Sequence, residues 1–335
     1  MLQLGERSDM PQMQPGIDIL QDAVALACRA PSVHNSQPWR WIAQGGRLEL
    51  FIDADRLVAT DRSGREALLS CGAVLDHLRV ALAAAGWTAH VDRYPNPNDH
   101  RHLASVEFSP MSYVTEAHRH RADAILKRRT DRLPFGAPAD WQSKEILLRN
   151  TFDDTGALLD VLSDDVRPRL AWASQLTTAL RQYDSAYHSE LDWWTGPFGD
   201  SDGIPHTSLV SAAEDDRVDI GRMFPVTRHH PQRRLDVPED QSKILVISAR
   251  DDTRDDVLRC GEALSQVLLE ATMAGLATCP LTHLTELEVS REVVAALAGR
   301  DFPQVVIRVG TVPSCDDVPP PTPRRRLADV LEVRL

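Results

Sequence analysis

The chain has 335 residues, of which 42% are hydrophobic and 26% charged, a composition typical of a folded globular protein with one large or two smaller domains. The formal net charge of −12 disfavours binding to nucleic acid or to anionic membranes, because both need a positive field. Five cysteines without a CxxC spacing, an N-terminus without a signal-peptide pattern and no apolar run of about 18 residues lead us to expect a cytoplasmic protein that does not span a membrane.

The first part of the chain predicts two helices that alternate with a turn and strands. Residues 17–28 read as an amphipathic helix, and the segment Ala-Pro-Ser-Val-His-Asn-Ser-Gln-Pro-Trp at 30–39 predicts a turn that ends in a buried tryptophan. The elements expected next are a strand at 48–52, a buried helix from Cys71 to Gly86 and a strand at 103–108.

The second part of the chain follows a similar order after a basic segment. Residues 127–132 read Lys-Arg-Arg-Thr-Asp-Arg, and a helix is expected at 169–190. The elements expected after it are a strand at 243–248, a buried helix from Cys260 to Gly275 and a strand at 304–309. A proline-rich stretch then predicts an extended C-terminal arm that carries Arg324, Arg325 and Arg326.

The two parts therefore indicate an internal duplication. Each buried helix begins near a Cys-Gly pair and ends at a glycine 15 residues after that cysteine, and Cys71 and Cys260 are 189 residues apart. The closing glycine fits a helix end where the chain turns left-handed. The segment 30–39 occurs only in the first part and the basic segment only in the second, so we expect one complete site and one dead site per chain.

Segments 30–39 and 127–132 resemble the two halves of the FMN site in the nitroreductase family, which come from different subunits of a dimer. The resemblance implies an α+β fold in which two fused halves, 17–115 and 116–335, form an intramolecular pseudo-dimer. The block APSVHNSQPWRW, with DRSGRE and LLSCGA after it, is similar to the Acg-type, dormancy-associated branch of that family over roughly 17–335. We therefore expect one FMN per chain, NAD(P)H as a co-substrate and a chain that acts as a monomer.

The same resemblance implies which residues bind FMN. Arginine suits its phosphate because the guanidinium makes bidentate, charge-assisted hydrogen bonds. The residues expected at the phosphate are Arg128, Arg129, Thr130, Arg132, Arg324 and Arg326. The residues expected around the ring are Pro31, Ser32, Val33, Asn35, Pro280, Leu281, Thr282 and His283. At 282–283 the chain departs from well-studied members, which have Glu-Gly there, and Arg65, Arg233 and Arg234 are the candidates for the cation near flavin N1–O2.

Residues 192–240 interrupt the second half with a segment that is rich in Gly, Pro and Asp yet carries aromatic residues. The large apolar side chains in it are Trp193, Trp194, Phe198, Met223 and Phe224. We interpret it as a lid over the flavin, the alternative being a packed surface excursion. The histidine pairs His118–His120 and His229–His230 lack further ligands at a characteristic spacing, so we expect no metal.

Three functions stay open at the level of sequence. The first is an FMN-dependent oxidoreductase that passes hydride from NAD(P)H to a small acceptor of the nitro or quinone type, with no catalytic side chain assigned. The second is a catalytically poor protein that sequesters or stores FMN under a closed lid. The third is a partner-binding module with a vestigial site, which would purify without flavin.

Overall fold

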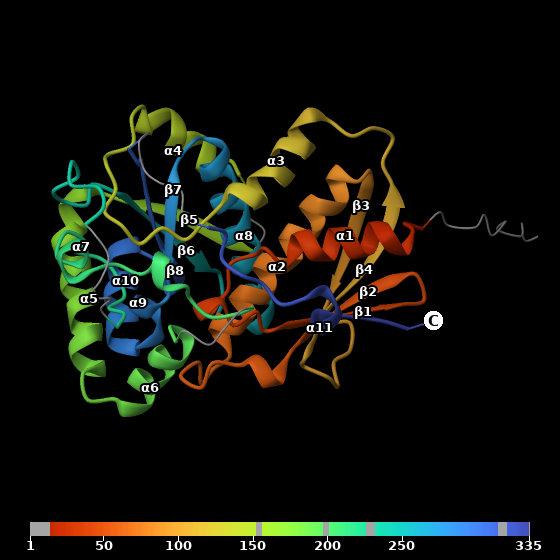
Figure 1. Cartoon of the computed structure of the whole chain (residues 1–335), viewed down its shortest axis with the longest axis horizontal. Helices are drawn as coiled ribbons and strands as arrows, with labels where there is room; N and C mark the ends of the chain where they lie inside the picture. The colour runs from red at the N-terminus through yellow and green to blue at the C-terminus, as the bar shows by residue number, and fades with distance from the viewer. Residues whose placement is uncertain (1–13, 152–155, 197–200, 226–231, 314–319, 335) are drawn as a thin grey trace, which may run out of the picture.

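Two sheets lie on either side of a central pair of helices in the computed structural model, which describes residues 14–151, 156–196, 201–225, 232–313 and 320–334 (Figure 1). The first sheet has the strand order β3-β4-β2-β1-β9 and the second β5-β6-β8-β7. The strands are β1 (Trp39–Gln44), β2 (Arg47–Ile52), β3 (Trp87–Arg93), β4 (His102–Pro110), β5 (Ala157–Leu162), β6 (Lys243–Ala249), β7 (Ala277–Leu281), β8 (Phe302–Gly310) and β9 (Leu331–Val333).

The two sheets repeat one topology, which confirms the predicted pseudo-dimer. In chain order, β1, β2, β3 and β4 correspond to β5, β6, β7 and β8, and corresponding strands have the same neighbours. Every pairing within these two sets of four strands is antiparallel. Only β9 lacks a counterpart among the described strands, and it pairs in parallel with β1.

The central helices α2 (Arg65–Ala84) and α8 (Arg254–Met273) cross at the repeated glycines. A Cβ added to Gly72 would lie 2.0 Å from the Leu258 carbonyl oxygen, and one added to Gly261 would lie 2.2 Å from the Leu69 carbonyl oxygen. These two contacts are related by the 189-residue offset, so the crossing lies on the pseudo-two-fold axis of the molecule. Backbone contact of this kind is open only to glycine.

Both central helices begin six residues before the predicted Cys, so the expected starts were wrong. The side chain of Asp61 accepts a hydrogen bond from the backbone of Ala67, and Thr253 caps α8 by accepting from the backbone of Asp256. These caps supply hydrogen-bond acceptors to backbone N–H groups of the first turn, which have no partner within the helix. Each helix can therefore begin before the cysteine. The predicted ends are confirmed, since Gly86 and Gly275 have φ values of 87° and 72°.

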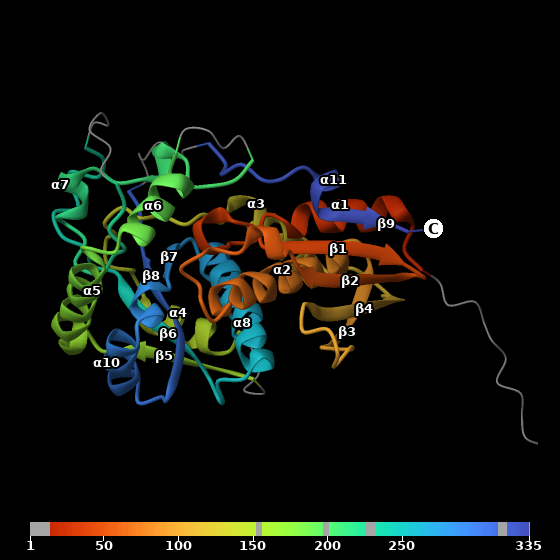
Figure 2. The same cartoon turned by 90° about the horizontal axis from the view of Figure 1, so that it is seen from below.

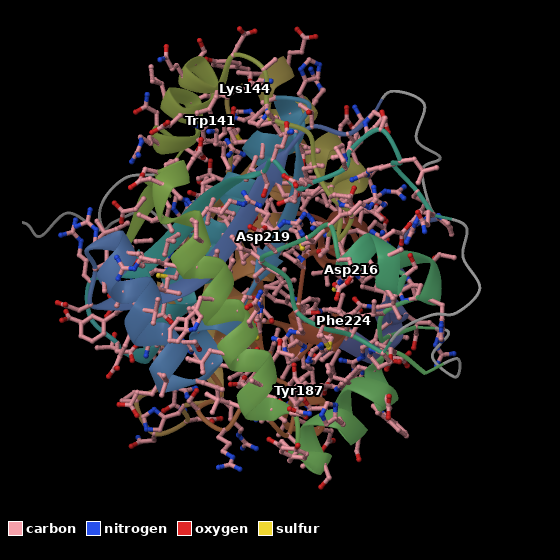
Figure 3. All side chains as sticks on the ribbon, turned by 90° about the vertical axis from the view of Figure 1, so that its left-hand side faces the viewer. Trp141, Lys144, Tyr187, Asp216, Asp219 and Phe224 are labelled. Atoms are coloured by element: carbon pink, nitrogen blue, oxygen red, sulfur yellow. The ribbon has the colours of Figure 1, made fainter. Side chains whose placement is uncertain are left out.

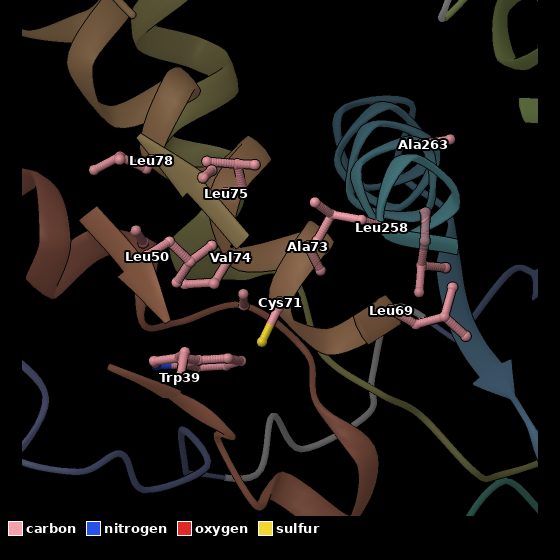
Figure 4. Close-up of a cluster of buried hydrophobic side chains, with 14 of the residues drawn as sticks. Trp39, Leu50, Leu69, Cys71, Ala73, Val74, Leu75, Leu78, Leu258 and Ala263 are labelled. Carbon is pink, nitrogen blue, oxygen red and sulfur yellow. The ribbon is translucent and has the colours of Figure 1, made fainter. Parts of the chain in front are cut away.

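The core of the first half forms where its sheet packs on α2. Figure 4 shows Trp39 and Leu50 of the sheet beside Cys71 and Val74 of the helix. Helix α2 is long and apolar enough by composition to cross a bilayer, but 83% of that window is buried inside the protein. Its apolar character is therefore explained by its place between the sheet and α8, where a helix is hydrophobic on all sides.

The remaining helices are α1 (Ile17–Ala27), α3 (Glu116–Lys127), α4 (Trp141–Arg149), α5 (Arg167–Arg181), α6 (Ser185–Trp194), α7 (Ala212–Asp215), α9 (His283–Glu286), α10 (Glu288–Ala298) and α11 (Leu327–Val330). Among them, α1 and α3 pack against the central pair, and α9 and α10 lie on the second sheet. The single helix predicted at 169–190 was wrong, because the chain breaks between α5 and α6. Asp184 caps the second helix by accepting a hydrogen bond from the backbone of Tyr187.

The C-terminal tail returns from the second half to the first. It runs past α11 and ends in β9, beside β1 (Figure 2). Arg325 fixes this path through an ion pair with Asp53 and by donating its backbone N–H to the side chain of Gln37. Because the second half thereby completes the first sheet, the division of the chain at 115/116 stays a prediction.

Candidate functional site

A cavity lies at the junction of the two halves, beside the N-terminal part of α2. It contains about 900 Å³ of space not filled by atoms, its open mouth included. We call it the ring cavity, because its walls are largely apolar and come from both halves. Its apolar lining includes Pro31, Val33, Leu69, Leu264, Cys279, Pro280, Leu281 and Val305.

A second, more polar cavity adjoins the first. It contains about 410 Å³ and shares Pro31, Ser32, Thr130 and Arg132 with the ring cavity. Because its other charged residues are also arginines, we call it the anion cavity. Those residues are Arg128 and Arg324.

Arg128 is the clearest sign of what the anion cavity binds. Its side chain is buried, with a residue exposure of 7%, and two of its guanidinium nitrogens, Nε and Nη1, have no hydrogen-bond partner. Burial, and then the charge of Arg29, lower its pKa to about 10. Burial and the charges of Arg29 and Arg128 likewise lower the pKa of Arg324 to about 9.

No carboxylate within the described ranges pairs with Arg29, Arg128 or Arg324. The three cations therefore repel one another without a protein counter-ion, at a buried place where an unpaired charge is costly. A multiply charged anion in the cavity would relieve that repulsion and supply acceptors for the orphaned N–H groups of Arg128.

The basic segment reaches the cavity because α3 ends at Lys127. Arg128 leaves the helix with an extended ψ of 134°, and the chain then runs beside β7. The backbone N–H of Asp131 donates to the Thr278 carbonyl at 3.0 Å, and Thr130 forms a bridge with Thr278. This pairing directs Thr130 and Arg132 into both cavities.

The turn at 31–37 supplies the opposite wall through an unusual backbone. His34, Asn35 and Gln37 all have φ between 50° and 57°, a left-handed region that is uncommon for non-glycine residues. Hydrogen bonds hold this shape: Val33 N–H donates to Ser70 Oγ, and Asn35 Nδ2 donates to the Gly203 and Pro323 carbonyls. Pro31, Ser32 and Val33 of this turn line the ring cavity, and Asn35 lines the anion cavity.

The loop after α8 lies at the ring cavity only in part. Pro280, Leu281 and Thr282 line the cavity, but His283 does not. The His283 Nε2 atom is 2.9 Å from Ser174 Oγ, behind the cavity wall. Burial, and then the charge of Arg222, lower the pKa of His283 to about 3, so the imidazole is neutral.

Two of the cations predicted for the phosphate lie away from both cavities. The Arg326 side chain is 83% exposed and is paired with Asp329, whereas Arg324 lines the anion cavity. Arg129 lines neither cavity, although its Nη1 atom is buried without a partner. Arg29 stands beside the anion cavity instead, a residue that the sequence analysis missed because it precedes the turn without a recognisable motif.

The arginines that line the ring cavity also differ from the sequence candidates. Arg65, Arg233 and Arg234 are engaged elsewhere, with Glu66, Glu214 and Asp131 respectively. The cavity is lined instead by Arg132, Arg222 and Arg308. Nothing in the sequence marks the last two, which come from the insertion and from the middle of β8.

Arg222 and Arg308 are each neutralised by a buried acid. Arg308 Nη2 lies 2.7 Å from Asp240 Oδ1, and Arg222 pairs with Glu286. Although burial would raise the pKa of Glu286, the charge and hydrogen bond of Arg222 lower it to about 2. These pairs fix both guanidinium groups at the wall of the ring cavity.

The described parts of the 192–240 insertion lie over both cavities. Ile204, Pro205 and Ser208 line the anion cavity, and six residues from 210 to 224 line the ring cavity. The Phe224 ring meets His34 edge-on at 6.2 Å, and the Arg132 guanidinium lies 4.9 Å from its centroid. Figure 3 shows Phe224, Asp216 and Asp219 along this segment, and Tyr187 on α6.

Hydrogen bonds from the first half hold the insertion in place. Gln37 Nε2 donates to the Ser201 carbonyl, and Arg56 pairs with Asp202. Of the aromatic residues expected in the lid, Trp193 is 78% exposed and Phe198 lies outside the described residues, as do 197–200 and 226–231 of the insertion.

Two positions related by the 189-residue offset differ in size and charge between the halves. Across the 189-residue offset, Ala73 corresponds to Glu262, and Thr282 corresponds to Arg93. The carboxylate of Glu262 accepts two hydrogen bonds from Arg93, each of 2.7 Å. A large charged side chain thus stands in the first half at the position equivalent to Thr282, which lines the ring cavity.

The chain was compared with known proteins, and no family model matches it. It is 60% identical over 327 residues to the Mycobacterium tuberculosis protein named "Putative NAD(P)H nitroreductase acg", covering 97% of this chain and 98% of that protein. A second M. tuberculosis protein named as an NAD(P)H nitroreductase is 37% identical over 322 residues, covering 95% and 92%.

Solved structures that resemble the chain include one named "putative nitroreductase" from Anabaena variabilis, with a TM-score of 0.47, 11% identity and 90% of each chain covered. Another is the FMN-dependent nitroreductase NfnB from Mycobacterium smegmatis, solved with NADPH. It has a TM-score of 0.35 and 17% identity, and the match covers 59% of this chain and 89% of that one.

Proposed function

Because this chain belongs to the nitroreductase family, in the branch of the Acg protein, we propose that it binds one FMN and passes reducing equivalents from NAD(P)H to a small nitro- or quinone-type acceptor. The observation that carries this proposal is the buried, unpaired guanidinium of Arg128 among other arginines. The dianionic phosphate of flavin mononucleotide would neutralise the arginines of the anion cavity. Its flat aromatic ring system would fit the ring cavity.

In this proposal each cavity binds one end of the cofactor. Arg128, Arg324 and Thr130 bind the phosphate, with Arg29 adding positive potential. The turn at 31–33 and the loop at 280–282 cover the ring, and Leu69, Leu264 and Val305 exclude water from it. When bound, FMN carries two electrons as hydride from a nicotinamide to an acceptor. The protein contributes position, positive potential from Arg132 and a dry cavity.

The proposed FMN binding is tested by replacing Arg128, the cation on which the proposal depends. We expect the purified protein to be yellow with about one FMN per chain, as one site implies. Arg128→Ala should weaken FMN binding by about 10- to 100-fold, the loss expected for charge-assisted hydrogen bonds. Arg119→Ala on the exposed face of α3 removes the same charge and should leave binding unchanged. A colourless wild-type protein that cannot be reconstituted with FMN would refute the proposal.

A second function, FMN sequestration, is favoured by one observation. The insertion lines both cavities and is hydrogen-bonded to the first half through Asn35 and Gln37, so it stands where a nicotinamide would approach. Anaerobic titration separates the two functions. Rapid bleaching by NADPH or NADH indicates the oxidoreductase, whereas bleaching by dithionite alone indicates sequestration.

We also propose that the chain acts as a monomer in the cytoplasm. Both sides of the site come from one polypeptide, so no second copy is needed to complete it. The cytoplasmic location rests on the cysteine pattern of the sequence. Light scattering of the FMN-loaded protein at micromolar concentration measures the assembly state, and a stable dimer would contradict the first part of this proposal.

A further inference from the structure

The roof of the ring cavity carries one carboxyl group for which the structure gives no partner. Asp215 ends α7 in the insertion and lines the ring cavity. Among the described residues no hydrogen bond or ion pair engages its carboxylate, whereas the neighbouring acid Glu214 is bound by Arg233 and Asp219 by Arg167. Asp215 is half-buried, so its carboxyl group stays within reach of water and of a ligand in the cavity.

The surroundings of Asp215 suit a group that gives up a proton near neutral pH. Burial, and then the adjacent charge of Asp216, raise its pKa to about 6, against the opposing charge of Arg308. Arg222 and Arg132 also line this cavity, but Arg222 is neutralised by Glu286. A general acid works best when its pKa lies near the working pH.

One other acid lines the same cavity and is less suited to this role. Glu66 lies on the α2 side and is buried, with an exposure of 4%. Its Oε1 atom accepts a hydrogen bond of 2.8 Å from the guanidinium of Arg65. Burial, and then a hydrogen bond with Asp61, raise the pKa of Glu66 well above its ordinary value, against the opposing charge of Arg65. Glu66 is therefore a proton-holding group fixed between Arg65 and Asp61, whereas Asp215 has both oxygens available on a segment that covers the cavity.

We propose that Asp215 is the acid that protonates the acceptor bound between the insertion and the flavin, an assignment that rests on the function proposed above. Reduction of a quinone to a hydroquinone consumes one hydride, from FMN previously reduced by NAD(P)H, and one proton. The hydride supplies both electrons. The proton moves from the Asp215 carboxyl to the acceptor oxygen, and the resulting carboxylate regains a proton from water.

The test compares acceptors that need a proton with one that does not. Protein loaded with FMN is reduced by dithionite without oxygen and mixed in a stopped-flow instrument with benzoquinone or with ferricyanide, which takes single electrons and no proton. Asp215→Asn should slow reoxidation by benzoquinone about 100-fold and leave the ferricyanide rate unchanged. Asp215→Glu should restore part of the benzoquinone rate.

The pH profile supplies the second readout. The wild-type benzoquinone rate should fall as pH rises above about 6, because the acid loses its proton there, and the rate of Asp215→Asn should be flat. In carboxyl-carbon NMR of the oxidised protein, one signal should titrate well above the ordinary range of aspartate and be missing from Asp215→Asn. The control is an exposed acid elsewhere in the insertion, and Asp236→Asn should keep the benzoquinone rate and this signal.

Three results would overturn the assignment of Asp215 as the proton donor. Equal slowing with both oxidants in Asp215→Asn would indicate general damage to the site, and wild-type behaviour with both would remove Asp215 from the reaction. Slowing specific to benzoquinone in Glu66→Gln instead would assign the proton to the α2 side. A protein that holds no FMN would refute the proposed function itself, which is a different outcome from each of these.

Discussion

His34 and His283 are buried as neutral imidazoles next to the ring cavity. Burial lowers the pKa of each to about 3, with the charge of Arg222 as the next cause. The unfolded chain binds a proton at each histidine below about pH 6.5, and the folded protein does not until about pH 3. Stability is therefore fully present above pH 6.5 and is lost as pH falls from there towards 3.

This linkage predicts that stability depends on pH and that replacing one of these histidines makes the dependence weaker. Each buried histidine should lower the free energy of unfolding by about 2 kcal/mol between pH 7 and pH 5. His34→Asn, which suits the left-handed φ of 50°, should remove one such contribution. Urea denaturation at both pH values measures the difference. His120→Asn on an exposed part of α3 serves as the control, and equal pH dependence in all three proteins would contradict the explanation.

Single residues of the site differ in how far sequence can identify them. The turn at 31–33 and Arg128 belong to contiguous motifs, and the structure brings both to the cavities. Arg222 and Asp215 reach the site only because the insertion folds over it, so no local pattern indicates them. Arg324 and Arg326 lie in the same basic run, and the sequence does not indicate which of them reaches the cavity. In the structure the extended arm places Arg324 at the anion cavity and Arg326 beside Asp329.

At the scale of elements, the crossing of α2 and α8 depends on two glycines. Gly72→Ala would place a methyl group 2.0 Å from a carbonyl oxygen of the partner helix. Because that oxygen belongs to the helix backbone, the clash is relieved only if the two helices separate. We expect a loss of about 3 kcal/mol or more in the free energy of unfolding, at the upper end of overpacking. Gly16→Ala, with open space around it, should cost at most about 1 kcal/mol through the helix cap.

Chemical denaturation of both variants measures this comparison. A Gly72→Ala protein as stable as Gly16→Ala would show that the central helices separate at little cost. Gly261→Ala, across the pseudo-two-fold axis, should behave like Gly72→Ala, because its added Cβ would meet the equivalent carbonyl of Leu69 at 2.2 Å.

The sequence predicts four of the nine described strands, β2, β4, β6 and β8, and both central helices, because these segments carry concentrated apolar residues. It does not predict where helices start or break, since these points depend on single capping side chains. Asp184 divides a continuous amphipathic pattern into two helices, and Asp61 and Thr253 extend the central helices towards their N-termini. Nor does periodicity indicate that β9 would join the sheet of the opposite half.

At the scale of the whole molecule, the C-terminal arm links the anion cavity to the first half. Arg324 donates hydrogen bonds to the Cys28, Arg29 and Ala30 carbonyls, at the end of α1. Arg324→Ala should therefore weaken FMN binding at least about tenfold, by removing a cation and loosening the arm. Arg326→Ala should have no effect, because that side chain is exposed and paired with Asp329.

Fluorescence titration of the flavin-free protein with FMN measures both affinities. Equal weakening by the two substitutions would indicate that the net charge of the arm matters and its position does not. If Arg324→Ala binds FMN as the wild type does, the phosphate is held without the arm.

The ion pair of Glu262 and Arg93 has a consequence for how this protein can change over time. In a dimer of identical subunits every mutation is present twice, so a side chain that fills one site fills the other as well. Here each half is encoded separately, so Glu262 can pair with Arg93 while the equivalent positions carry Ala73 and Thr282. A substitution at the ring cavity therefore need not suit the equivalent position of the other half.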